Sequence, residues 1–113
     1  MRFFEVYAVN KPELKTDKLF SGTPSAAAKK AMTAMCKDVS GTCSLTVTMR
    51  EVKRTMSSGQ YMTIPVKDSD NMPIMRKYKL KRTLNETPVV FEGATPITFR
   101  YKVDIVESFG RVA

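Results

Sequence analysis

Only one segment of the chain has the apolar spacing of a helix, and this limits the folds that are open to it. Thr23-Pro24 is a strong helix start, because threonine can cap free amides and proline loses no hydrogen bond at the first helical position. Residues 25–38 are rich in alanine, and apolar side chains recur there at steps of three and four residues. The resulting stripe consists of Ala28, Ala31, Met32, Met35, Cys36 and Val39. Because a single helix cannot supply the crossovers of parallel βαβ units, we expect an antiparallel sheet.

The remaining apolar segments are short, rich in β-branched and aromatic residues, and separated by turn signals. Strands are predicted for residues 2–9, 18–21, 44–53, 60–66, 76–82 and 97–105. We expect an α+β fold in which one helix packs on a curved antiparallel sheet or small pseudo-barrel, in a single domain spanning residues 1–113. Residues 55–75 are predicted to form either a hairpin or a mobile arm. The tail from Glu107 to Ala113 is short and is expected to fray.

Residues 76–82 carry five positive charges and no acid. Read as a strand, the segment has one apolar face, formed by Tyr78 and Leu80. Its opposite face holds a row of cations at intervals of about 6.6 Å, which is two strand rises. The cations of this row are Lys77, Lys79 and Lys81, and Arg76 and Arg82 lie at the two ends of the segment. A phosphate backbone would match this row, and the alternative is an edge strand that lysines protect against aggregation.

Positive charge is concentrated in the middle of the chain. The formal net charge is +8, and residues 23–82 alone hold twelve bases and four acids. Residues 1–22 carry a net charge of +1, and residues 83–113 carry −1. A regional excess of this kind is the electrostatic footprint that binding to an acidic polymer requires.

The chain contains no histidine, which removes the commonest general base and the commonest metal ligand. We therefore expect no enzymatic activity, no cofactor and no metal site. Two cysteines, Cys36 and Cys43, are too few for a zinc site. A disulfide between them is possible if the chain turns at residues 40–42. We favour free thiols in a reducing compartment, because a chain of 113 residues can fold without a disulfide.

No stretch approaches the ~20 apolar residues that are needed to span a bilayer. The first four residues imitate a signal peptide, but Glu5 then interrupts the apolar region. We expect a soluble, intracellular protein with no membrane partner.

Three segments supply cations that neighbouring antiparallel strands can merge into one patch. Besides residues 76–82, they are the end of the strand before Gly59 and the strand at 97–105. If about five phosphates are neutralised there, the logarithm of affinity falls with log salt at a slope of about −4.5. The candidate nucleic-acid-binding residues are Arg50, Lys53, Arg54, Arg76, Lys77, Lys79, Lys81, Arg82, Arg100 and Lys102.

The residues after Gly59 have two interpretations. Tyr61, Met62 and Ile64 can serve as apolar wedges that unstack a base step, as architectural proteins use them. The alternative is that they are ordinary strand core, which is the interpretation that we favour.

A resemblance to a known family appears at residues 19–31, which read Leu-Phe-Ser-Gly-Thr-Pro-Ser-Ala-Ala-Ala-Lys-Lys-Ala. This segment resembles the strand-turn-helix opening of the methanogen chromosomal protein family, small monomeric archaeal chromatin proteins with viral relatives in large eukaryotic DNA viruses. Residues 48–54, 78–82 and 99–103 are similar to the family as well. The resemblance implies a β-β-α-β-β-β pseudo-barrel that binds duplex DNA non-specifically and bends it. The matching positions are Arg50, Arg54, Lys77, Lys79, Lys81, Arg100 and Lys102.

The chain also departs from that family. It lacks tryptophan, it has an insertion around residues 66–75, and Asp68 and Asp70 lie where an arm approaching DNA should be basic. The resemblance places the protein with DNA, in a nucleoid, a viral factory or a virion. The alternative is a minor capsid or virion structural protein of a large DNA virus that binds acidic protein surfaces. In either case we expect a monomer or a component of a larger assembly.

Overall fold

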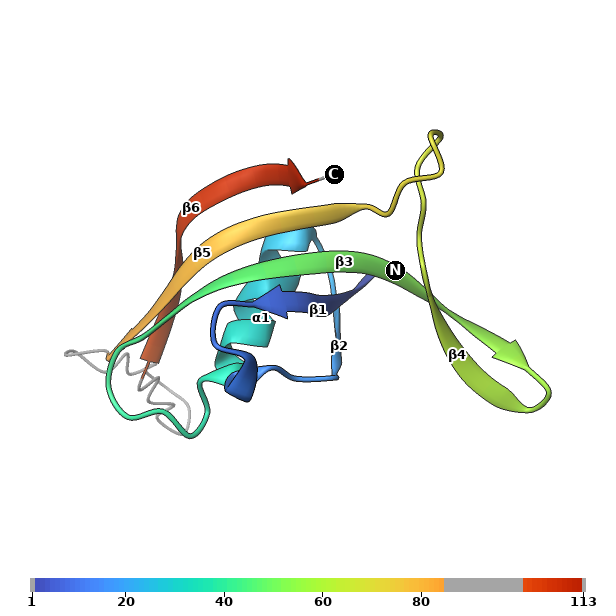
Figure 1. The fold of residues 1–113 in the computed structure, drawn as a ribbon. Helices are drawn as coiled ribbons and strands as arrows, with labels where there is room; N and C mark the ends of the chain where they lie inside the picture. The colour runs from blue at the N-terminus through green and yellow to red at the C-terminus, as the bar shows by residue number, and fades with distance from the viewer. Residues whose placement is uncertain (1, 85–100, 113) are drawn as a thin grey trace, which may run out of the picture.

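The described residues form one helix packed on a six-stranded antiparallel sheet, which confirms the α+β prediction (Figure 1). The structure is a computed structural model that describes residues 2–84 and 101–112. Predictions that fall on residues 85–100, among them Arg100 and the start of the strand at 97–105, lie outside the described residues. The elements are β1 Phe3–Val9, η1 Pro12–Leu14, β2 Leu19–Ser21, α1 Pro24–Met35, β3 Cys43–Ser57, β4 Gln60–Pro65, β5 Met75–Leu84 and β6 Tyr101–Val112.

The strand order is β2-β1-β3-β5-β6, and every neighbouring pair is antiparallel. β4 lies off this order, because it pairs with the second half of β3, from Val52↔Pro65 to Ser57↔Gln60. Among the described strands β2 and β6 are the two edges, so the curved sheet is open and does not close into a barrel. Within the described residues four strands follow the helix, one more than the β-β-α-β-β-β arrangement that the resemblance implies.

Helix α1 begins as predicted at the Thr23 cap, whose side-chain oxygen accepts a hydrogen bond from the Ala26 N–H at 3.3 Å. Ala27, Ala28 and Ala31 of the helix are fully buried, and their small size lets the helix lie close to the sheet. Full burial of a side chain such as Leu80 stabilises the fold by about 1.5–3 kcal/mol, so this interface fixes which face of the sheet is covered. The core consists of Phe4, Val6, Val9, Ala27, Ala28, Ala31, Met32, Met35, Cys36, Cys43, Leu45, Val47, Met49, Tyr78 and Leu80.

Arg82 is buried, and the prediction that grouped it with exposed binding residues is wrong about its position. Strand alternation puts its side chain on the same face as Leu80, toward the C-terminal end of α1. There its guanidinium donates hydrogen bonds to the carbonyl oxygens of Cys36, Val39 (2.6 Å) and Gly41 (2.9 Å). The cation therefore satisfies carbonyl groups at and beyond the helix end, where intrahelical partners are missing.

Cys36 and Cys43 form a disulfide, so the expectation of free thiols is wrong. The loop after α1 turns at Gly41, whose φ of 72° lies in the region that favours glycine. This turn brings the two Cα atoms to 6.2 Å, within the range that a disulfide requires. Arg82 contacts the same loop and is also the cross-strand partner of Cys43. The turn was visible in the sequence, but the contact with β5 holds it in place.

β6 continues to Val112, so the expectation that the chain frays from Glu107 onward is wrong for the described residues. The strand pairs with β5 along its length. Two register shifts leave Val106 and Phe109 as the extra residues of β-bulges. The end of the strand is also held by an ion pair between Arg111 and the loop before β5.

Candidate nucleic-acid interface

Helix α1 covers one face of the sheet, and no described element covers the opposite face, which we call the open face. Alternation along β5 buries Tyr78 and Leu80 against the helix and leaves Lys77, Lys79 and Lys81 on the open face. We call these three side chains the lysine row. None of them forms an ion pair with a described residue. Their positive charges are therefore available to a ligand above the sheet.

In the part of the chain that the structure describes, acidic side chains border the lysine row on the β6 side only. The register of β5 with β6 puts Asp104 opposite Lys81 and Glu107 opposite Lys79. The predicted residue Lys102 is exposed on the same face, but its amine lies 4.0 Å from the carboxylate of Asp104. The carboxylates of β6 therefore weaken the positive potential on that side and leave it strongest toward β3.

The neighbouring strand β3 presents hydroxyl groups to the lysine row. Ser44, Thr46 and Thr48 are the cross-strand partners of the three lysines. These three residues are not among the candidate binding residues predicted from the sequence, although the polar alternation of residues 44–50 was a visible signal. A binding site defined by the three lysines alone would therefore leave out the three hydroxyl groups that lie opposite them.

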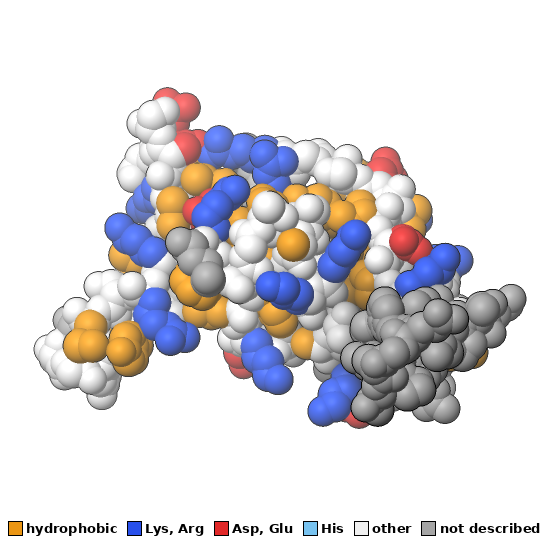
Figure 2. Space-filling model, turned by 180° about the vertical axis from the view of Figure 1, so that it is seen from behind, with side chains coloured by type: hydrophobic (Ala, Val, Ile, Leu, Met, Phe, Trp, Pro, Cys, Tyr) orange, Lys and Arg blue, Asp and Glu red, His pale blue; other side chains and the backbone are white. Residues whose placement is uncertain are grey.

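Positive side chains also lie on the other side of the molecule. Figure 2 shows Lys and Arg side chains scattered over the view from behind, with no single continuous patch. Lys29, Lys30 and Lys37 are exposed on α1 or just after it. The cations are thus divided between surfaces, and the lysine row is their most regular arrangement.

Two of the remaining predicted arginines are not free on the open face. Arg50 lies on this face, but its guanidinium pairs with Glu5 and lies over the Tyr7 ring, 5.0 Å from the centroid. Arg76 is exposed on the side of β5 that faces away from the lysine row, and its cross-strand partner is Arg111. Arg50 is therefore partly neutralised, and Arg76 belongs to a different surface.

β4 and the second half of β3 form a hairpin, residues 52–65, that projects from the body of the molecule and is called the arm below (Figure 1). Its turn is Ser58-Gly59, with φ values of 52° and 78°, as a two-residue hairpin turn requires. Lys53 and Arg54 lie on the arm, and the guanidinium of Arg54 lies 5.3 Å from the centre of the Tyr61 ring. Of the predicted segment 55–75, residues 55–65 belong to this hairpin, and residues 66–74 form the loop between β4 and β5.

The end of the arm carries exposed apolar side chains. Met56, Tyr61 and Met62 are 62%, 67% and 52% exposed. The favoured interpretation of Tyr61 and Met62 as strand core is therefore wrong, because no described element packs on the end of the arm, while Ile64 is half-buried. Large exposed apolar groups flanked by cations are typical of interaction sites.

A hollow of about 570 Å³ lies at the base of the arm. Its floor is apolar, formed by Ile64, Pro65 and Val66, and Lys53 and Lys67 complete its lining. Lys67 was not among the predicted site residues. Together with Lys53 it extends the positive charge from the arm toward the body.

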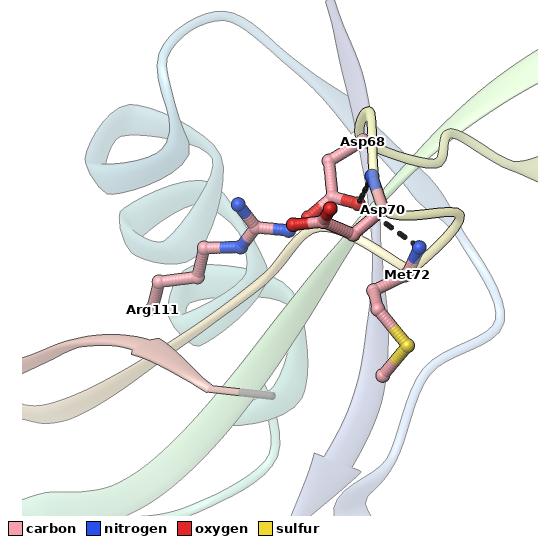
Figure 3. A network of polar contacts seen from close by, with 4 residues as sticks. All are labelled: Asp68, Asp70, Met72 and Arg111. Atoms are coloured by element: carbon pink, nitrogen blue, oxygen red, sulfur yellow. Dashed lines mark hydrogen bonds and ion pairs between the residues drawn. The ribbon is translucent and has the colours of Figure 1, made fainter.

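Asp68 and Asp70 lie in the loop between β4 and β5 and not at the end of the arm. The Asp68 carboxylate accepts hydrogen bonds from the backbone N–H groups of Asp70 (2.9 Å) and Met72 (3.0 Å), and it pairs with Arg111 (Figure 3). These contacts hold the pKa of Asp68 below its ordinary value, and the hydrogen bond from the Met72 N–H has the largest effect. The two acidic residues therefore give no reason to exclude binding of a polyanion by the arm.

The loop that Asp68 closes is expected to open only in acid. The folded pKa of Asp68 lies below the ordinary value of 3.8, so its carboxylate stabilises the loop above that pH and stops doing so as the pH falls through the folded pKa. An NMR titration of the Asp68 carboxyl carbon should therefore have its midpoint below 3.8. In Arg111→Ala the midpoint should rise only part of the way, because the Met72 hydrogen bond remains. A wild-type midpoint at or above the ordinary value would contradict these contacts.

A scan of the chain against protein-family models found no match, and searches of curated proteins and of solved structures found none either. The resemblance to the methanogen chromosomal proteins therefore stays a prediction. Within residues 2–84 and 101–112, no helix is long and apolar enough to cross a membrane. The same residues contain no group of three or more His, Cys, Asp or Glu side chains placed to hold a metal ion.

Proposed function

We propose that this protein is an architectural protein that binds duplex DNA without sequence specificity and bends or compacts it. The observation that carries this proposal is the lysine row, in which three ammonium groups follow one another on an uncovered sheet face without an ion pair to any described residue. Phosphate contacts supply most of the affinity in non-specific DNA binding, and they need a cationic track more than groups that read bases.

The helix supports a non-specific mode of binding. Reading bases in the major groove requires side chains such as Asn, Gln or Arg on an element that can enter the groove. α1 contains none of these residue types, and its apolar stripe is buried against the sheet. Its exposed residues, such as Lys29 and Lys30, suit phosphate contacts at most.

The arm supports the bending component of the proposal. Alternation along β3 puts Arg54 and Met56 on the same side of the strand as Thr48, although the strand twists over this distance. Met56 and its cross-strand partner Tyr61 are exposed at the projecting end. Architectural proteins insert apolar side chains of this kind between base steps and so kink the duplex.

The test is a titration of the pure protein with fluorescent duplexes of unrelated sequence at several salt concentrations. With about four to six phosphate contacts, the logarithm of affinity should fall with log salt at a slope of about −4 to −5 and should depend little on sequence. Energy transfer between dyes on the two duplex ends should increase on binding, because bending brings the ends together. A duplex that binds no more tightly than an equally charged polyglutamate would contradict the proposal.

A second candidate function is that of a virion or capsid structural protein that docks on acidic protein surfaces. The exposed Met56, Tyr61 and Met62 favour it, because methionine and aromatic residues are enriched in protein interfaces. Association with acidic proteins in the absence of salt-dependent DNA binding would support this candidate over the first. Under the first proposal the protein is located with DNA, and under the second it is located in the particle shell.

A further inference from the structure

A regular array of hydroxyl groups accompanies the lysine row on the open face. In the antiparallel register of β3 with β5, each lysine of the row lies directly opposite a serine or a threonine. Residues opposite each other share a face and have Cβ atoms about 5 Å apart, so one oxyanion can contact both members of a pair. We call this arrangement the hydroxyl–lysine ladder, and its rungs are Thr48 with Lys77, Thr46 with Lys79 and Ser44 with Lys81.

The ladder is open to a ligand. Ser44, Lys79 and Lys81 are exposed, and the other members are half-buried. The backbone N–H of Thr46 donates to the side-chain oxygen of Asn10 at 3.0 Å, while its hydroxyl forms no hydrogen bond with another described residue. A shallow hollow of about 260 Å³ lies beside the rung of Thr48, between β1 and β5. The hydroxyl and ammonium groups of the ladder therefore form no hydrogen bond or ion pair with another described residue.

The two sides of the ladder differ in charge. On the β6 side, Asp104 and Glu107 lie opposite two lysines of the row. At the third lysine, the amine of Lys77 lies 5.3 Å from the centre of the Phe109 ring. An anion above β5 is therefore repelled by β6 and attracted toward the hydroxyl groups of β3. This asymmetry favours a track along the furrow between β3 and β5.

The spacing of the rungs selects among polyanions. Alternate Cα atoms of a peptide chain are separated by as many covalent bonds as successive phosphorus atoms of a nucleic-acid strand. In extended chains the Cα repeat and the phosphorus repeat are therefore similar, at about 6.6 Å. In inorganic polyphosphate a single bridging oxygen separates the phosphorus atoms, and neighbouring phosphates are too close together for successive rungs.

We propose that the hydroxyl–lysine ladder binds the phosphodiester backbone of one nucleic-acid strand, with one phosphate at each rung. Each phosphate contacts one ammonium group by charge and one hydroxyl group by a hydrogen bond, and serine and threonine are common phosphate donors in protein–DNA complexes. This inference rests on the proposed function. It adds the surface that the nucleic acid contacts and the direction of the bound strand, which follows β3 and β5. It also assigns part of the affinity to hydroxyl groups and not to net charge. Because only one strand is held, single-stranded DNA should bind as well.

The test is the triple variant Ser44→Ala, Thr46→Val, Thr48→Val, which removes the hydroxyls and leaves every charge in place. Its affinity for a labelled oligothymidine and for a random duplex should fall about tenfold at constant salt, or about 1.4 kcal/mol, with an unchanged salt slope. Valine is favoured in strands, so the fold should be retained, and circular dichroism and the melting temperature check this. Oligothymidine should also displace bound duplex at a lower phosphate concentration than inorganic polyphosphate does.

Two control variants test whether the hydroxyl groups of the ladder are themselves responsible for the loss. Thr46→Ser with Thr48→Ser keeps both hydroxyls and should bind as the wild type does, and Thr33→Val on α1 removes a hydroxyl from the other side of the sheet and should have no effect. If the triple variant binds as tightly as the wild type, or if inorganic polyphosphate competes as well as oligothymidine, the ladder is overturned while the proposed function stands. If the wild type binds neither nucleic acid, both proposals fail.

Discussion

Changing Lys77, Lys79 and Lys81 together to glutamine is expected to weaken the binding of duplex DNA by roughly 10²- to 10³-fold near about 0.1 M salt. These three amines are evenly spaced on the open face, and none of them forms an ion pair with a described residue. Each phosphate contact that is lost removes about 0.9 from the salt slope, so the slope should become shallower by about 2.7. The measurement is a salt titration with a fluorescent duplex, with the melting temperature as a check of the fold.

A matched control carries the same change in net charge on the other side of the sheet. Lys29, Lys30 and Lys37, which are exposed on α1 or just after it, are changed to glutamine in one variant. This variant should lose affinity only a few-fold, because distant exposed charges are largely screened at this salt concentration. Equal losses in the two variants would show that binding follows net charge alone, and the open face would no longer be the site.

Replacing Arg82 with leucine is expected to lower the free energy of unfolding by about 3–5 kcal/mol, a large part of the stability of a small domain, because several carbonyl groups lose their hydrogen bonds together. The guanidinium donates to the carbonyl oxygens of Cys36, Val39 and Gly41, and it lies 4.0 Å from the centre of the Tyr101 ring. Without it, these carbonyl groups lose their partners close to the core. Urea denaturation with the disulfide kept oxidised should show a midpoint lower by about 2 M.

The control for Arg82 lies on the same strand. Arg76 projects from the same side of β5 but is exposed, so Arg76→Leu should change the free energy of unfolding by no more than about 0.5 kcal/mol. Arg82→Lys should fall between the two, because an ammonium group cannot reach several carbonyl groups with the fork of a guanidinium. If Arg82→Leu were as stable as Arg76→Leu, the contacts of Arg82 with the loop would contribute nothing to stability.

The elements of this fold were predictable where local signals were strong. The Thr23 cap and the alanine-rich stripe located α1 to within a few residues, alternation located β3 and β5, and the content of Phe, Tyr and Val located β1. The two faces of β5 were also predictable, since side chains alternate along any strand. The same alternation assigns Arg82 to the face of Leu80, but the sequence did not reveal the loop carbonyl groups that make burial of this charge possible.

Other features depended on contacts between distant residues. The Cys36–Cys43 disulfide forms in a loop that β5 holds through Arg82. The apolar end of the arm is exposed because β3 extends beyond the strands that flank its first half, which no local pattern reveals. The pairing of hydroxyls with lysines depends on the register of β3 with β5. A shift of one residue would have placed these hydroxyls on the other face.

The sequence by itself determined the α+β class, the position of the helix and the existence of a cationic strand, because these depend on capping, periodicity and composition within short segments. Tertiary structure alone decided that the lysines lie beside hydroxyls on one edge and carboxylates on the other, and that one arginine serves the fold while its neighbours face solvent. The physical reason is that strand pairing joins residues that lie far apart in the sequence. The free energy that sets the register comes from burial against α1 and not from the charges themselves.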